Sequence, residues 1–303
     1  MKKKFEKIIY GIIPKHSFVP VVSVLLLQFV SYYIPKLLNR GRVFYDLSTA
    51  PDGIIPFVPA FVVFYVLAFL QWVVYYLLLA REETNVMRRY LAAGVVSKLT
   101  CMLLFLAVPT SIVRPAAEGR GLFLFCCRTV FAFDEPTNLF PSMHCLESWL
   151  CMRLALEQLR RGRVPELARS MVKGYTGEMI LCVNRKEFKG LEEYLTKIKR
   201  TELETMFERL VSRKRWRFED RIAAAADDAA EAAEDEGLVY VRFHTIRTVI
   251  LSVLVFLSTL FIKQHYFVDV IGGIALAELA LLAGRIFEKR TNAEADRPAA
   301  RGG

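Results

Sequence analysis

The 303-residue sequence lacks the patterns that mark several common classes of protein. Its six cysteines show neither metal-ligand spacing nor the pattern of a secreted disulfide scaffold, so we expect them to be small packing residues. No H-E-x-x-H sequence is present. No small-residue cleavage site follows the first apolar block, so we expect that block to remain as a membrane anchor.

The sequence is rich in long apolar segments. Hydrophobic residues make up 54% of the chain, and its mean hydropathy is +0.32. They gather in blocks near the ~20 residues that cross a bilayer core, whereas a soluble helical protein would show amphipathic stripes. The sequence therefore predicts an all-α fold, a six-span transmembrane helical bundle. The predicted spans are residues 19–38, 54–80, 91–113, 140–156, 248–263 and 266–284.

The fourth predicted span, residues 140–156, is the weakest of the six. It is shorter than the others and carries Ser142, His144 and Glu147. Taken alone, it is also consistent with a buried core helix. Its inclusion is what gives an even number of spans and places both termini on the same side of the membrane.

The net charge of +10 is distributed unevenly around the predicted spans. Basic residues are denser in the N-terminal segment, the 81–89 loop and the C-terminal tail than in the intervening loops, which favours cytoplasmic placement of both termini. We therefore predict an integral protein of the plasma or inner membrane. The expected partners are the membrane and a lipid phosphate, with no nucleic acid.

The chain divides into four predicted regions. Residues 1–158 form a first membrane half, 241–290 a second membrane half, and 291–303 a disordered tail. Between the halves, residues 159–240 are heavily charged but nearly neutral overall, which predicts a mostly helical cytoplasmic insertion. Its role is open: it could regulate the protein, dock an unknown protein partner, touch anionic lipid, or have no role.

Three short segments carry polar groups that a membrane span normally excludes. They are Arg114-Pro115, the run from Phe140 to His144, and residues 258–273. With six spans, all three segments lie at the same membrane face. Ionisable residues at a membrane edge are costly and are commonly functional, so the convergence predicts a site.

The residue types in these segments suit phosphoryl transfer. His265 and Asp269 are four residues apart, so on a helix the carboxylate can orient the imidazole for nucleophilic attack. His144 offers a general acid and base, and Arg114 offers a cation for the phosphoryl oxygens. Ser142 and Ser258 can donate hydroxyl hydrogen bonds to the same group. No cofactor is implied.

Each residue also has a simpler interpretation. His265 and Asp269 could be a satisfied polar pair, Arg114 a snorkelling anchor, and Ser142 an N-cap. A zinc site formed by His144, His265 and Asp269 is a further alternative, although no ligand pattern supports it.

The three segments resemble the signature of the type-2 phosphatidic acid phosphatase superfamily, K-x6-R-P, P-S-G-H and S-R-x5-H-x3-D. The resemblance implies six helices, no metal and a phosphohistidine intermediate on His265. It further implies that Asp269 orients that histidine and that His144 is the general acid. The phosphate-binding residues implied by the resemblance are Arg114, Ser142 and Ser258. The P-S-M-H segment and the run through His265 are also similar to inositol phosphorylceramide and sphingomyelin synthases.

This chain departs from the signature at three positions. Ala107 stands where the pattern has lysine, Met143 where it has glycine, and Thr259 where it has arginine. Two phosphate-binding cations are therefore missing from their usual positions. Cations elsewhere in the chain could replace them, the candidates being Lys98, Arg128 and Lys263.

These observations lead to three hypotheses about function. The first is a lipid phosphate phosphatase, a phosphoric monoester hydrolase that acts at the outer face. The second is a phospholipid headgroup phosphotransferase, in which an alcohol replaces water as the acceptor. The third is an inactive membrane scaffold, which the substitutions at Ala107 and Thr259 favour and the presence of His144, His265 and Asp269 disfavours.

Overall fold

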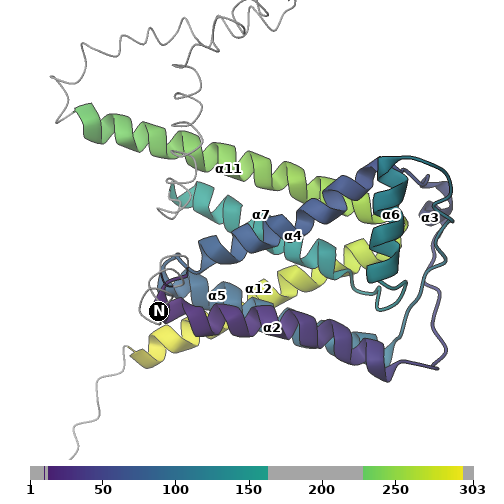
Figure 1. The fold of residues 1–303 in the computed structure, drawn as a ribbon. Coiled ribbons are helices and arrows are strands. Elements are labelled where there is room, and N and C mark those ends of the chain that lie inside the picture. The colour runs from purple at the N-terminus through teal and green to yellow at the C-terminus, as the bar shows by residue number, and fades with distance from the viewer. Residues whose placement is uncertain (1–9, 11–12, 163–227, 296–303) are drawn as a thin grey trace, which may run out of the picture. The chain divides into compact units, whose positions relative to one another are not determined.

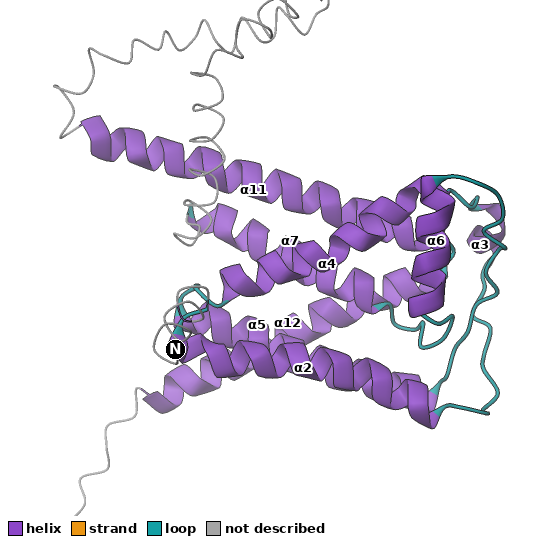
Figure 2. Ribbon diagram, in the orientation of Figure 1, coloured by secondary structure: helices purple, strands orange, loops and turns teal. Residues whose placement is uncertain are grey.

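The computed structural model describes residue 10 and residues 13–162 and 228–295. For residues 228–240, 294 and 295 it describes the backbone alone. All of the regular structure in this part of the chain is helical (Figure 2), apart from isolated bridges that join Tyr45 to Thr110 and Ser111 to Thr137. Most of the predicted insertion, 159–240, lies outside the described residues.

The helices follow the apolar blocks closely (Figure 1). In chain order they are α2 (Lys15–Leu38), α3 (Ala50–Ile54), the short helix η1 (Pro59–Phe61), α4 (Val62–Leu79), α5 (Thr84–Ala107), α6 (Leu122–Phe133), α7 (Met143–Arg161), α11 (Asp228–Phe261) and α12 (Phe267–Ala295). The all-helical prediction is therefore confirmed for the described residues, and α3 and α6 are additional helices that the apolar pattern did not predict.

Five helices in the described ranges are long and apolar enough to cross a membrane, where six spans were predicted. They cover Lys15–Leu38, Pro59–Leu79, Thr84–Ala107, Val241–Phe261 and Phe267–Ala293. The predicted fourth span is the exception. It forms α7, whose polar residues, Glu147 and Gln158 among them, lower its mean hydropathy.

Three helix boundaries differ from the prediction, and the first of them affects the site. Helix α5 ends at Ala107 instead of continuing to 113, so Arg114 lies in a loop rather than at a helix end. Helix α11 begins at Asp228, inside the region predicted as the insertion, and continues without a break through the span. Helix α12 continues to Ala295, past the predicted start of the tail at 291.

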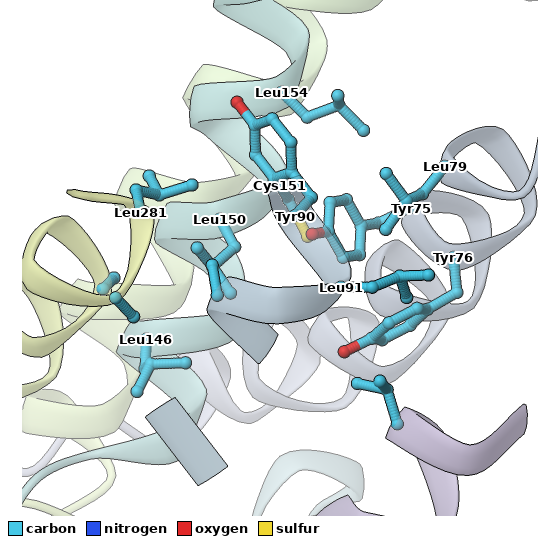
Figure 3. Packing of buried hydrophobic residues seen from close by; sticks show 14 of the residues in the cluster. Tyr75, Tyr76, Leu79, Tyr90, Leu91, Leu146, Leu150, Cys151, Leu154 and Leu281 are labelled. Carbon is cyan, nitrogen blue, oxygen red and sulfur yellow. The ribbon is translucent and has the colours of Figure 1, made fainter. Parts of the chain in front are cut away.

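Helix α7 lies in the interior of the bundle, between α4 and α12 (Figure 1). Its Leu146, Leu150 and Leu154 are almost completely buried, and Figure 3 shows them packed with residues of neighbouring helices. The partners labelled there are Tyr75, Tyr76 and Leu79 of α4, Tyr90 and Leu91 of α5, and Leu281 of α12. Because its neighbours shield it, α7 can carry polar residues that a lipid-facing helix could not.

Small residues let α12 approach the start of α7. A Cβ atom added to Gly273 would lie 2.4 Å from the carbonyl oxygen of Ser142, and one added to Gly272 would lie 2.5 Å from the ring of Phe140. Real Cβ atoms essentially never come so close, so both positions require glycine. This close contact brings the Phe140–His144 segment against the segment that contains His265 and Asp269.

Candidate active site

The turn between α11 and α12 positions His265. After α11 ends at Phe261, the backbone N–H groups of Gln264 and His265 both donate to the carbonyl oxygen of Thr259, at 2.9 and 3.1 Å. Asp269, in the first turn of α12, accepts a 2.8 Å hydrogen bond from the backbone N–H of Tyr266. The His265 Nδ1 atom lies 3.4 Å from the same carboxylate oxygen.

This geometry differs from the predicted one in a single respect. His265 precedes α12 instead of sharing a helix with Asp269, yet the turn still brings the two side chains together. With Nδ1 facing the carboxylate, Nε2 is the nitrogen left for attack on a substrate. Both side chains are buried, so the pair is well protected from bulk water.

His144 is the second residue of α7 and is surrounded by aromatic rings of α4. Its imidazole stacks on Tyr65 with a centroid distance of 4.2 Å and lies 5.0 Å from the Trp72 ring. The imidazole of His265 is 6.0 Å away, centroid to centroid. The structure therefore brings together two histidines that are far apart in the sequence.

Arg114 lies beside the His265 turn. Its guanidinium donates to the side-chain carbonyl of Gln264, the residue before His265, and to the backbone carbonyl of Asp134 at 2.5 Å. It also lies 5.0 Å from the ring centroid of Phe131. Burial lowers the pKa of this guanidinium below its usual range, and the negative charge of Asp134 partly opposes that effect.

The two serines are engaged in their own helices. The Ser142 Oγ atom accepts a 3.3 Å hydrogen bond from the backbone N–H of Cys145, which is the N-cap role given above as its simpler interpretation. The backbone N–H of Ser142 donates to the carbonyl oxygen of Asp269 at 3.0 Å, which ties the two segments together. The Ser258 hydroxyl donates to the carbonyl oxygen of Val255 at 2.7 Å. Their phosphate-binding roles stay predictions.

The three cations considered as replacements all have other partners. Lys98 is fully buried and pairs with Glu147. Lys263 donates to the carbonyl oxygens of Asp52 and Ile55. Arg128 donates to backbone carbonyls of the 117–119 loop. Of these four cations, Arg114 is the one whose side chain contacts the residue before His265.

Asp134, which directly follows α6, is an acidic residue near the two histidines that the sequence pattern did not predict. Its carboxylate accepts hydrogen bonds from the hydroxyl groups of Tyr32, at 2.5 Å, and Tyr65. Burial raises the pKa of this carboxyl, but the neighbouring His144 imidazole and the two tyrosine hydroxyls outweigh burial and hold the pKa below its usual range. The available signal was a carboxylate at the end of an apolar run, in F-A-F-D-E.

Several buried polar atoms at this site have no hydrogen-bond partner in the part of the chain that is described. They are Arg114 Nε, His144 Nε2, Gln264 Nε2, His265 Nδ1 and Asp269 Oδ1. An unsatisfied buried polar group costs about 1–3 kcal/mol, and native proteins contain few of them. The two histidines therefore lie among buried polar atoms that lack a hydrogen-bond partner in the described ranges, with His265 Nδ1 still 3.4 Å from the Asp269 carboxylate.

No arrangement of the described residues matches the zinc site that the sequence left as an alternative. No group of three or more His, Cys, Asp or Glu side chains in the described ranges is placed to hold a metal ion. The His144 and His265 ring centroids are 6.0 Å apart, and the residue paired with Asp269 is His265.

No protein-family model, curated protein or solved structure matches this chain. The geometry of the site and the pattern of its residues are therefore the grounds for assigning it a function.

Proposed function

We propose that this chain is an integral membrane lipid phosphate phosphatase that works through a phosphohistidine on His265, without a metal. The observation that supports this most is the meeting of His265–Asp269, His144 and Arg114 around buried polar atoms that lack partners. These residues match the pattern that resembles the type-2 phosphatidic acid phosphatase superfamily, and the contacts of His265 with Asp269, of His144 with His265 and of Arg114 with Gln264 link them.

The proposed reaction has two steps. In the first, His265 Nε2 attacks phosphorus, the bond from phosphorus to the lipid oxygen breaks, and His144 gives a proton to the departing alkoxide. In the second, His144 removes a proton from water, the water oxygen attacks phosphorus, and the phosphorus–nitrogen bond breaks. Inorganic phosphate leaves and His265 is regenerated. Asp269 keeps the imidazole oriented, and Arg114 stabilises the phosphoryl oxygens.

The proposal includes α7 as a sixth span. Its 19 residues are about 28 Å long at 1.5 Å per residue, close to the hydrocarbon thickness of a bilayer. With α7 spanning, the histidines lie at one membrane face, and the N-terminal end of α2 and the C-terminal end of α12 share the other end of the bundle (Figure 1). We assign the histidine end to the outer face and both termini to the cytoplasm, from the distribution of basic residues.

A second candidate function, headgroup phosphotransfer from a phospholipid, is favoured by the charge of the site. Asp134 and Asp269 are both carboxylates, while Arg114 is the cation that, among the described residues, contacts the turn of His265. A phosphomonoester carries up to two negative charges, whereas a phosphodiester carries one. Two like charges about 6 Å apart repel each other by about 3 kcal/mol at an effective dielectric constant near 20. Asp134 therefore disfavours a dianionic monoester.

The covalent step can be tested with the purified full chain in detergent. We expect a short reaction with a ³²P-labelled lipid phosphate, in the presence of EDTA, to leave acid-labile and alkali-stable label on the protein. His265→Ala should abolish both label and turnover. His16→Ala is the matched control, because His16 is exposed and lies outside the site. If the His265→Ala variant carried as much label as the wild-type protein, or kept full turnover, the proposal would be overturned.

The acceptor can be tested with the same preparation. Hydrolysis predicts release of phosphate from a lipid phosphate when no alcohol is added. Transfer predicts slow release and movement of a labelled headgroup from a phospholipid to an added lipid alcohol. Because Asp134→Asn removes a negative charge, we expect it to raise the rate with monoester relative to diester by ten-fold or more. An unchanged ratio would contradict the charge argument.

A further inference from the structure

A second feature lies away from the histidines, in a cleft between α4, α7 and α11. Its volume is about 130 Å³, comparable to the apolar cavities of ~150 Å³ that bind small hydrophobic molecules such as benzene. The lining is mostly apolar, and includes Leu67, Leu70, Val74, Leu78, Leu154 and Leu251. The cleft can therefore hold a segment of one hydrocarbon chain.

Polar contacts hold α11 beside α4 and α7 and so fix the walls of the cleft. The Gln71 side-chain N–H group donates to the Ser252 hydroxyl at 2.9 Å, and that hydroxyl donates to the carbonyl oxygen of Ser148 at 2.9 Å. The Thr245 hydroxyl donates to the carbonyl oxygen of Ala155 at 3.0 Å. These bonds come from side chains that line or border the cleft, so its shape is determined by specific interactions.

A cation stands at the edge of this apolar cleft. Arg247 is exposed and lines the cleft within the apolar span Val241–Phe261. Its guanidinium lies 3.3 Å from a ring nitrogen of His244, and no carboxylate in the described ranges pairs with it. Arg247 is the seventh residue of that span, and a charged side chain within a membrane helix is costly unless it has a polar partner, so a nearby anion would be favourable.

The cleft also holds buried acceptors without partners. The side-chain oxygens of Gln71 and Gln158, both cleft residues, accept no hydrogen bond from any described residue. A ligand with a hydroxyl group would satisfy such an acceptor. The apolar walls and a cation without a carboxylate partner in the described ranges together describe the complement of an amphiphile with an anionic head.

We propose that this cleft binds one anionic glycerophospholipid, with a chain segment between α4, α7 and α11 and its phosphate on Arg247. Guanidinium and phosphate form strong paired hydrogen bonds, which are stronger where water is scarce. The lipid occupies a site separate from His144 and His265, since the cleft is lined by the part of α7 from Cys151 to Gln158. The proposal stands whether or not the chain hydrolyses lipid phosphates.

Native mass spectrometry of the detergent-purified full chain tests this. We expect one molecule of added phosphatidylglycerol to stay bound, with affinity about ten-fold higher than that of phosphatidylcholine of the same chain length. Arg247→Gln should bring phosphatidylglycerol down to the level of phosphatidylcholine. Arg285→Gln is the matched control, because Arg285 is an exposed arginine within the span on α12. Equal effects of the two substitutions would overturn the assignment of the phosphate to Arg247.

A second pair of variants tests where the hydrocarbon chain of the lipid binds. Ala155 is buried and lines the cleft, so Ala155→Phe should fill it and reduce the binding of both lipids at least five-fold. Ala275→Phe on the exposed face of α12 should leave binding unchanged. Both variants should be compared at equal folded fraction, measured by size-exclusion chromatography. Unchanged lipid binding in folded Ala155→Phe would show that the lipid sits elsewhere.

Discussion

Replacement of Lys98 by methionine gives the sharpest test of how the bundle is held together. Lys98 on α5 and Glu147 on α7 form an ion pair in which the side chains are 0% and 1% exposed. The Tyr76 hydroxyl of α4 contacts both: it accepts from Lys98 at 3.0 Å and donates to Glu147 at 3.1 Å. Three helices thus meet at one charged contact in the apolar core.

The size of the effect follows from burial. Lys98→Met leaves the Glu147 carboxylate buried with the tyrosine hydroxyl as its remaining described partner, and removal of one member of a buried pair costs about 3–5 kcal/mol. That is a roughly 100- to 5,000-fold loss in the ratio of folded to unfolded protein. Replacement of both residues by methionine removes both charges, and such exchanges are often neutral or stabilising by about 1–4 kcal/mol.

The measurement is a double-mutant cycle on purified protein in detergent, by chemical unfolding followed by circular dichroism or tryptophan fluorescence. We expect Lys98→Met and Glu147→Met to be strongly destabilising and the double variant to recover most of the loss, which corresponds to a large coupling energy. Additive effects of the two substitutions would refute the reasoning, because they would mean that the two charges do not compensate each other.

Three further outcomes follow from the site. Gly273→Ala should destabilise the protein by about 1–3 kcal/mol and reduce activity, because its Cβ would collide with a carbonyl oxygen at the start of α7. Gly53 has open space around it, so Gly53→Ala should be near neutral in the same unfolding and activity assays. Asp269→Asn should lower turnover less than His265→Ala in steady-state assays, because loss of the orienting group leaves the nucleophile in place; the reverse order would contradict these roles. Because the pKa of the Asp134 carboxyl is held below its usual range, its stabilising contribution should be present above about pH 4 and fall on acidification, and Asp134→Asn should flatten that part of the pH–stability curve.

The sequence was most informative where one local property decides the outcome. Blocks such as 54–80 contain so little polar surface that only a membrane-spanning helix suits them, and the structure has a long apolar helix there. It was less informative about α7, because hydropathy measures the helix alone. The polar residues of α7 lie in the interior of the bundle, where neighbouring helices pair with them, as when Lys98 pairs with Glu147.

The sequence by itself determined the all-helical, membrane-embedded character of the described chain and the residues suited to phosphoryl chemistry, because composition and short spacings encode both. Only the tertiary structure decided which of those residues meet. Gly273 permits the approach of α12 to α7, the turn before α12 brings His265 to Asp269, and the loop after α5 brings Arg114 to that turn. Asp134 entered the site for the same reason: contacts between residues distant in the chain depend on helix packing, which no local pattern records.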